Sequence, residues 1–229
     1  MQNNFRYELK FILDENKAHN CFEWINSIGA TEKYSCRTNN SIYFDDLENS
    51  SVRENLMGIS QRKKIRMRWY GNDAKSLSDL KLEIKERKGR LNSKTNIPLP
   101  ALSKLIHQTT ISELNEKLMK CLRELNSNDT VLNQYLIPEL LIRYQRLYFE
   151  TRDSIRITFD KNIKFFNVIS NQRLNELTPV DYRMGVMEVK FLPENKDKVA
   201  NFLRRTYLTP KRHSKYLVGL SVLKSVLYY

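Results

Sequence analysis

The chain has 229 residues, of which 41% are hydrophobic and 28% are charged, and its formal net charge is +13. This composition excludes a disordered tail and predicts one soluble domain over residues 1–229. No apolar run approaches the ~20 residues of a membrane span, the N-terminal sequence lacks the apolar stretch of a signal peptide, and the cysteines lack metal-ligand spacing. We therefore expect a cytoplasmic protein with reduced thiols and a polyanionic partner.

Seven segments alternate apolar and polar residues with the period of two that is typical of strands. In chain order they are residues 5–11, 41–46, 63–70, 81–88, 142–150, 155–160 and 186–191. Four other segments have the apolar spacing of helices, at residues 14–29, 101–126, 193–206 and 214–227. Asp14 and Ser214 are the expected caps of the first and last of these helices.

The strand 63–70 shows how the charges are distributed. Ile65, Met67 and Trp69 share one side, and Arg66 and Arg68 lie on the other. Across six strands the same polar register holds eight cationic and three acidic residues: Arg6, Lys10, Arg66, Arg68, Lys85, Arg146, Arg156 and Lys190 with Glu8, Glu83 and Glu188. The pattern fits either an antiparallel sheet with a solvated charged face or a barrel whose charged faces line a bore and whose helices pack outside.

A bore of unpaired cations would have to be solvated or filled by an anion, because removing one unpaired charge from water costs several kcal/mol. Arginine suits phosphate, since its planar fork donates two parallel hydrogen bonds to one phosphate group. Carboxylate ligands favour Mg²⁺ or Mn²⁺, and the chain has no His/Cys cluster for zinc.

Several short motifs follow one another along almost the whole chain. They are Arg6-Tyr7-Glu8-Leu9-Lys10, "SIYFDD" (41–46), Arg66-Met67-Arg68, Glu83-Ile84-Lys85, Tyr144-Gln145-Arg146, Arg156-Ile157-Thr158-Phe159-Asp160, Glu188-Val189-Lys190 and "RHSKY" (212–216). This succession resembles the vacuolar transporter chaperone (VTC) branch of the CYTH, or triphosphate tunnel metalloenzyme, superfamily, in which Arg replaces the first Glu of an ExExK signature. The resemblance implies an α+β fold, with an antiparallel eight-stranded β-barrel tunnel, a charged interior and helices packed outside.

The resemblance also implies roles for individual residues. Phosphates in the tunnel would be gripped by Lys10, Arg66, Arg68, Lys85, Arg146, Arg156 and Lys215. Further substrate contacts would come from Arg6, Tyr144, Lys190, Arg212 and Ser214, although Ser214 equally fits a simple helix cap. Glu188 would hold Mn²⁺ or Mg²⁺, and Glu8 would be either a second metal ligand or an ion-pair partner of a tunnel cation. Asp160 fits a strand end.

The implied activity is that of a polyphosphate polymerase, which transfers the γ-phosphate of ATP to a growing inorganic polyphosphate chain and releases ADP. Transfer needs charge neutralisation and no base, because the attacking phosphate oxygen is already anionic. A tunnel-type phosphatase of inorganic triphosphate or nucleoside triphosphates stays open, as does a non-catalytic binder of polyphosphate or RNA. Single-strand readers of nucleic acid stack bases on exposed aromatic side chains, so Trp69, opposite the arginines, argues against this alternative, whereas Tyr144 and Tyr148 keep it open. A membrane-protein partner also stays open.

These roles lead to one expectation for a variant. Replacing Arg66 and Arg68 with Ala should weaken triphosphate binding. Stability should hold or rise, because two mutually repelling cations are removed.

Overall fold

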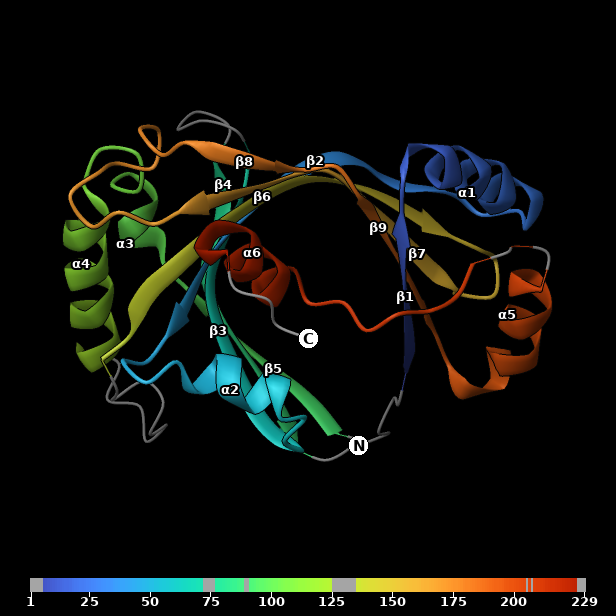
Figure 1. Ribbon diagram of the computed structural model, residues 1–229, viewed down its shortest axis with the longest axis horizontal. Coiled ribbons are helices and arrows are strands. Elements are labelled where there is room, and N and C mark those ends of the chain that lie inside the picture. The colour runs from blue at the N-terminus through green and yellow to red at the C-terminus, as the bar shows by residue number, and fades with distance from the viewer. Residues whose placement is uncertain are drawn as a thin grey trace. The chain divides into compact units, whose positions relative to one another are not determined.

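The computed structural model describes residues 6–71, 77–88, 91–124, 135–204, 206 and 208–225. Its strands are β1 (Tyr7–Leu13), β2 (Thr31–Asp45), β3 (Gln61–Tyr70), β4 (Ser78–Lys88), β5 (Leu91–Pro98), β6 (Ile137–Glu150), β7 (Arg156–Asn167), β8 (Pro179–Tyr182) and β9 (Gly185–Phe191). Its helices are α1 (Glu15–Ser27), α2 (Ser50–Leu56), α3 (Pro100–Ser103), α4 (Ile111–Glu124), α5 (Lys196–Leu203), which follows a 3-10 turn at Pro193–Asn195, and α6 (Lys215–Lys224) (Figure 1). The strand order is β1-β9-β7-β6-β2-β3-β4-β5, and β8 pairs with β7.

The chain divides into two compact units. Unit 1 comprises Met1–Thr38, Tyr144–Ile163 and Asp181–Ser214, and unit 2 comprises Asn39–Arg143, Lys164–Val180 and Lys215–Tyr229. Three long strands, β2, β6 and β7, contribute residues to both units. In each unit one face of the sheet is apolar and packs against helices, while the other face is polar.

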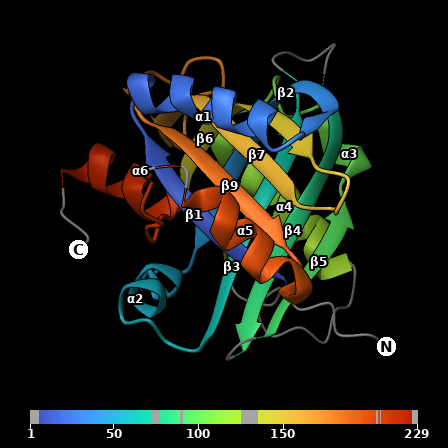
Figure 2. The same ribbon diagram turned by 90° about the vertical axis from the view of Figure 1, so that its right-hand side faces the viewer.

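In unit 1 the helices α1 and α5 cover the apolar faces of β1, β7 and β9 (Figure 2). The N-cap predicted for the first helix is confirmed, because the Asp14 carboxylate accepts a hydrogen bond of 2.8 Å from the Lys17 amide. The Trp24 indole of α1 donates to the Phe202 carbonyl of α5 at 3.0 Å. The buried core consists of apolar side chains from these strands and helices: Phe11, Leu13, Cys21, Ile25, Ile157, Phe159, Met187, Val189, Phe191 and Val199.

In unit 2 the apolar sides of β2, β3 and β4 pack against α3 and α4. The predicted sidedness of β3 is confirmed, since Ile65, Met67 and Trp69 are buried in this core and Trp69 is only 1% exposed. Helix α4 presents Leu114, Leu118 and Leu122 at intervals of one turn. A sheet face that buries its apolar residues in this way leaves the arginines of β3 on the opposite face.

Helix α6 contacts the face of unit 2 that carries Tyr43 and Asp45, and the backbone amides of α2 donate to Asp45 on the same face. The Tyr216 ring stacks on Tyr43 of β2 with ring centroids 5.0 Å apart. Gly219 permits a close approach, because a Cβ atom there would lie 2.6 Å from Leu140 Cδ2 and 2.8 Å from Phe165 Cδ1. With any larger residue at 219, either the helix or these two side chains would have to shift.

The α+β class and the antiparallel sheet are confirmed. The described strands number nine instead of eight, and their order ends at β1 and β5, so closure into a barrel is not shown. The helix expected over 101–126 is interrupted, because a capping box begins α4 afresh: Thr110 N–H donates to Glu113 Oε2 at 3.0 Å and Glu113 N–H donates to Thr110 Oγ1 at 3.3 Å. Strands β5 and β8, helix α2, and residues 31–40 of β2, 137–141 of β6 and 161–167 of β7 were not expected.

Parts of the expected elements lie outside the described residues, at positions 5, 125–126, 205 and 226–227. The single domain over 1–229 stays a prediction. Within the described part of the chain, no helix has the length and apolar character needed to cross a membrane.

Candidate functional site

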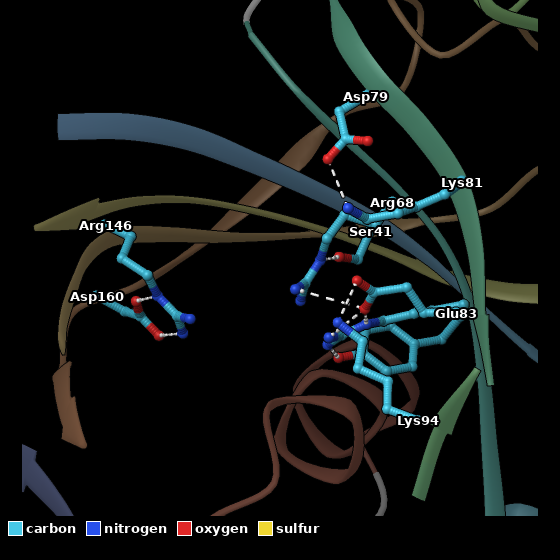
Figure 3. Close-up of polar contacts among 10 residues, drawn as sticks. Ser41, Arg68, Asp79, Lys81, Glu83, Lys94, Arg146 and Asp160 are labelled. Atoms are coloured by element: carbon cyan, nitrogen blue, oxygen red, sulfur yellow. Dashed lines mark hydrogen bonds and ion pairs between the residues drawn. The ribbon is translucent and has the colours of Figure 1, made fainter. Parts of the chain in front are cut away.

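The polar face of unit 2 gathers cations around one carboxylate. The pairing of β3 with β4 sets Arg66 opposite Glu83, and the pairing of β4 with β5 brings Lys94 within reach. Glu83 Oε2 accepts from Arg66 Nε at 2.7 Å and lies 2.6 Å from Arg66 Nη2 and 3.5 Å from Arg68 Nη1. Glu83 Oε1 accepts from Lys94 Nζ at 2.6 Å. Figure 3 shows Arg68 and Lys94 pointing toward Glu83.

The charge of Glu83 is strongly stabilised although the residue is only 2% exposed. Burial acts to raise the pKa of Glu83, but the charges of Arg66 and Arg68 and the hydrogen bonds from Lys94 and Arg66 outweigh it and lower the pKa from 4.5 to about 2. The carboxylate is therefore ionised at neutral pH. It balances one of three positive charges, so the cluster keeps a net positive charge.

Tyr43 extends this cluster toward α6. Its hydroxyl accepts a hydrogen bond of 3.0 Å from Arg66 Nη1. Burial acts to raise the pKa of Tyr43, but the charges of Arg66 and Arg68 and the hydrogen bond from Arg66 lower it from 10.0 to about 8. The ring of Tyr216 stacks on Tyr43, and the hydroxyl of Tyr216 donates to the buried Asp45 carboxylate at 3.0 Å. Tyr43 thus connects Arg66 to α6, by a hydrogen bond on one side and ring stacking on the other.

Two further predicted phosphate ligands belong to unit 2 but lie outside the described contacts of Glu83. Lys85 is exposed on β4, where it is in register with Lys64 and Lys94. Lys215 is the first residue of α6 and is partly buried.

In unit 1 the central polar contact is a bidentate ion pair. Arg146 Nε and Nη2 donate to the two oxygens of Asp160 at 2.5 and 2.7 Å (Figure 3). Asp160 is only 1% exposed, and the Arg146 guanidinium lies 5.2 Å from the ring centre of the buried Tyr144. Burial acts to lower the pKa of Arg146, but the Asp160 charge raises it well above its usual value. The expectation that Asp160 ends its strand is wrong, because β7 continues to Asn167, and Asp160 pairs with a predicted phosphate ligand from within the strand.

A second polar group of unit 1 lies on β1 and β9 and alternates in charge. The pairing of these strands sets Glu8 opposite Lys190 and Lys10 opposite Glu188. Lys190 Nζ lies 2.5 Å from Glu188 and 3.5 Å from Glu8, and Lys10 Nζ lies 3.0 Å from Glu8. Glu8 thus has the ion-pair contacts that were one of its two predicted roles.

These two carboxylates also suit a divalent metal. Mg²⁺ and Mn²⁺ accept carboxylate oxygens from the protein and complete their shells with water or phosphate oxygens. Among the described residues, no group of three or more His, Cys, Asp or Glu side chains could hold a metal by itself. Glu8 and Glu188 would therefore need phosphate or water oxygens to complete the coordination.

The remaining predicted ligands of unit 1 lie nearer the surface. Arg156 is exposed on β7 in register with Lys190, and Arg6 and Arg212 are exposed as well. Ser214 is partly buried. Lys10 Nζ donates to the His213 carbonyl at 3.3 Å, which ties β1 to the segment that carries Arg212 and Ser214.

Comparison with known proteins gives the family. The family model of the VTC domain matches residues 5–224. The chain belongs to the VTC domain family. The resemblance found in the sequence motifs is thereby confirmed, although no curated protein sequence matches this VTC domain.

Solved structures similar to this VTC domain support the fold. A Vibrio parahaemolyticus protein assigned as an adenylate cyclase has a TM-score of 0.51 at 13% identity, over 96% of this chain and 99% of that one. A Pyrococcus horikoshii protein has a TM-score of 0.53 at 13% identity, over 96% and 98% of the two chains. A Hippeastrum protein with a dominant triphosphatase activity has a TM-score of 0.52 at 15% identity, over 94% and 95%. At such identities the likeness shows the fold alone.

Sequence reasoning missed three polar residues of the VTC domain. Lys94 lies on β5, which is rich in Asn, Ser and Lys and has few β-branched residues, so its sequence lacks a strand signal. Tyr43 and Asp45 lie in the "SIYFDD" motif, but their partners Arg66 and Tyr216 are distant in the sequence. The parity of Tyr43 with Ser41 was the available signal, because it places both residues on the face opposite Ile42.

Proposed function

We propose that this VTC domain is a polyphosphate polymerase that transfers the γ-phosphate of ATP to inorganic polyphosphate and releases ADP. The observation that carries the proposal is the cluster of Arg66, Arg68 and Lys94 around one buried carboxylate, which holds excess positive charge on an ordered sheet face. Arginine and lysine in such a setting are suited to phosphate, because charge-assisted hydrogen bonds are roughly twice as strong as neutral ones. Membership of the VTC family supports the same substrate class.

Phosphate contacts are assigned to cations of both polar faces. In unit 2 the proposed ligands are Arg66, Arg68, Lys85 and Lys215, and Lys94, which donates to the same carboxylate as Arg66, is proposed as a further one. In unit 1 they are Lys10, Arg146 and Arg156, supplemented by Arg6, Tyr144, Lys190, Arg212 and Ser214. Arg146 would use the part of its guanidinium that does not face Asp160, so Asp160 orients it toward the substrate.

The reaction transfers a phosphoryl group between phosphates. A terminal oxygen of the polyphosphate chain attacks the γ-phosphorus of ATP, the bond from that phosphorus to the β-bridging oxygen breaks, and ADP leaves. No proton has to be removed, because the attacking oxygen is already anionic. What the protein supplies is neutralisation of two polyanions that must approach in line, and Arg and Lys side chains supply it. Arg6, which replaces the first Glu of the ExExK signature, adds to that positive charge.

Glu188 and Glu8 are the residues proposed to hold Mn²⁺ or Mg²⁺. A divalent ion bound there would neutralise phosphate charge. Lys190, which contacts both carboxylates, would keep the two strands paired at this point.

Two observations weaken the RNA-binding alternative. Trp69 is buried in the core of unit 2, and the ring of Tyr144 is buried below Arg146, so neither offers an exposed stacking surface.

The three cysteines are free, which supports the cytoplasmic, ATP-containing location that the sequence predicts.

Incubation of the pure protein with ATP and Mn²⁺ tests the proposed activity. A polyphosphate-staining gel should show chains that lengthen with time, and ADP should appear in step with them. The R66A/R68A variant, assayed at a temperature where it is folded, is the control and should form no chains. Orthophosphate without any chain would contradict the polymerase and support the triphosphatase.

A further inference from the structure

A buried carboxylate lies among the cations assigned to phosphate. Simple electrostatics would exclude it, because Glu83 removes one positive charge from a face that has to attract polyanions. It is also only 2% exposed, and a buried charge is costly unless it is paired and hydrogen-bonded. Its presence in the cluster therefore needs a reason other than charge.

The contacts of Glu83 supply that reason. Glu83 occupies the Nε and Nη2 edge of Arg66, one of the two edges through which a guanidinium makes bidentate contacts, while Tyr43 accepts from Nη1. Arg68 is held by the same carboxylate through Nη1 and donates from Nε to Ser41 Oγ at 3.3 Å. Acceptors on β2 and β4 thus flank both guanidinium groups of β3.

A free arginine side chain loses conformational entropy when it binds a ligand, and holding its guanidinium in one orientation beforehand reduces that loss. The guanidinium is then already oriented when a phosphate arrives. An anion that took the Nε and Nη2 edge of Arg66 would have to displace a buried carboxylate. We therefore expect a phosphate to contact guanidinium N–H groups that Glu83 does not occupy.

We propose that Glu83 is a positioning residue, which orients Arg66 and Arg68 for phosphate and thereby strengthens binding of a polyanion although it is itself negatively charged. This inference rests on the proposed function and deepens it. It predicts an effect opposite in sign to that of charge alone. Removing the negative charge should weaken triphosphate binding.

Calorimetric titration with inorganic tripolyphosphate tests the inference on the full chain. The variants are E83Q, K94M and E83Q/K94M, and the double variant has the same net charge as the wild type. Comparing E83Q with the wild type, and E83Q/K94M with K94M, isolates Glu83 in two charge backgrounds. Positioning predicts that the dissociation constant rises about tenfold or more in both comparisons, the equivalent of one lost charge-assisted contact.

Tighter binding after E83Q in either background would overturn the inference, because it is the result that charge alone predicts. An unchanged dissociation constant with a lower melting temperature would overturn it as well, since a purely structural role reduces the folded fraction and leaves the affinity of folded molecules intact. Stoichiometry from the titration separates these two effects.

The E83D variant keeps the test decisive if the Gln variants do not fold. It retains the charge that balances the buried cations but withdraws the carboxylate from Arg66 by one methylene. Positioning predicts weaker binding than in the wild type, and a role in charge alone predicts no change. Failure of the wild type itself to bind tripolyphosphate would instead contradict the proposed function.

Discussion

Arg66 and Arg68 share a carboxylate, and this changes what their removal should do. The sequence pattern led to the expectation that losing both would leave stability unchanged or higher. That expectation rested on the repulsion between the two arginines, but the structure shows that both pair with Glu83. Without them Glu83 would be left buried with Lys94 as its remaining described ion-pair partner. Breaking a buried ion pair from one side costs about 3–5 kcal/mol.

We therefore expect R66A/R68A to lose several kcal/mol of unfolding free energy as well as triphosphate binding. Urea denaturation of R66A/R68A and of R66A/R68A/E83Q measures this. The triple variant should regain part of the lost stability, because the stranded carboxylate is gone. Equal stability of the two variants would show that Glu83 is not paired in the way described.

The pKa of Glu83 gives a second prediction at this scale. Its pKa in the folded protein, about 2, lies below the ordinary value of 4.5, so its contribution to stability is full above pH 4.5 and is lost as the pH falls toward 2. The shift corresponds to about 3 kcal/mol. Unfolding free energies of the wild type and E83Q, measured between pH 2 and 6, should therefore converge as the pH falls.

The neighbouring pair of Glu86 with Lys63, at 2.6 Å on the same two strands, offers a matched control. The side chain of Glu86 is more exposed than that of Glu83, and exposed ion pairs contribute only about 0–1 kcal/mol to the free energy of unfolding. E86Q should therefore keep most of the pH dependence of the wild type. A profile for E83Q that stays parallel to the wild type would contradict the pairing of Glu83.

Much of the residue-level pattern could be predicted. Alternation in "KKIRMRWYG" placed Arg66 and Arg68 on the polar side of β3, because the period of a strand fixes which side chains share a face. Which partner each arginine takes could not be read, because Glu83 and Lys94 come from later strands and their register is set by tertiary pairing.

At the scale of elements, the position of α6 depends on Gly219. Gly219 lets the helix approach Leu140 of β6 and Phe165 of β7 more closely than any Cβ would permit. In an exposed helix, Ala in place of Gly stabilises by about 1 kcal/mol. Here overpacking should prevail and destabilise the protein by about 1–3 kcal/mol.

G219A should therefore lower the melting temperature and weaken ATP binding, because displacing α6 moves Tyr216 away from Tyr43 and Asp45. S221A, two residues along the same helix and partly exposed, is the control and should be neutral or slightly stabilising. Differential scanning calorimetry and ATP titration read both effects. A rise in melting temperature for G219A would show that α6 does not pack in this way.

The elements that sequence patterns missed have identifiable causes. The break before α4 was signalled by the capping box of Thr110 and Glu113, which apolar spacing alone overlooks. Helix α2 has seven residues, too few for a periodic signal, and is held by backbone amides that donate to Asp45. Local propensity cannot show such tertiary support.

For the whole molecule, the net charge of +13 and the ordered succession of motifs already indicated the family, and the family match over residues 5–224 confirms it. Charge sets the class of partner but not the reaction. Transfer and hydrolysis of a triphosphate differ in which oxygen attacks the γ-phosphorus, and both need the same cations.

The most direct test of the polymerase proposal identifies that attacking oxygen. The protein is incubated with ATP, Mn²⁺ and a short polyphosphate primer in water enriched in ¹⁸O, and the phosphate products are analysed by mass spectrometry. Attack by polyphosphate predicts chains longer than the primer, with no ¹⁸O incorporated at the transfer step and one ADP formed for each phosphate added. Orthophosphate that contains one solvent-derived ¹⁸O per ADP, with no longer chains, would contradict the account and show that water is the acceptor.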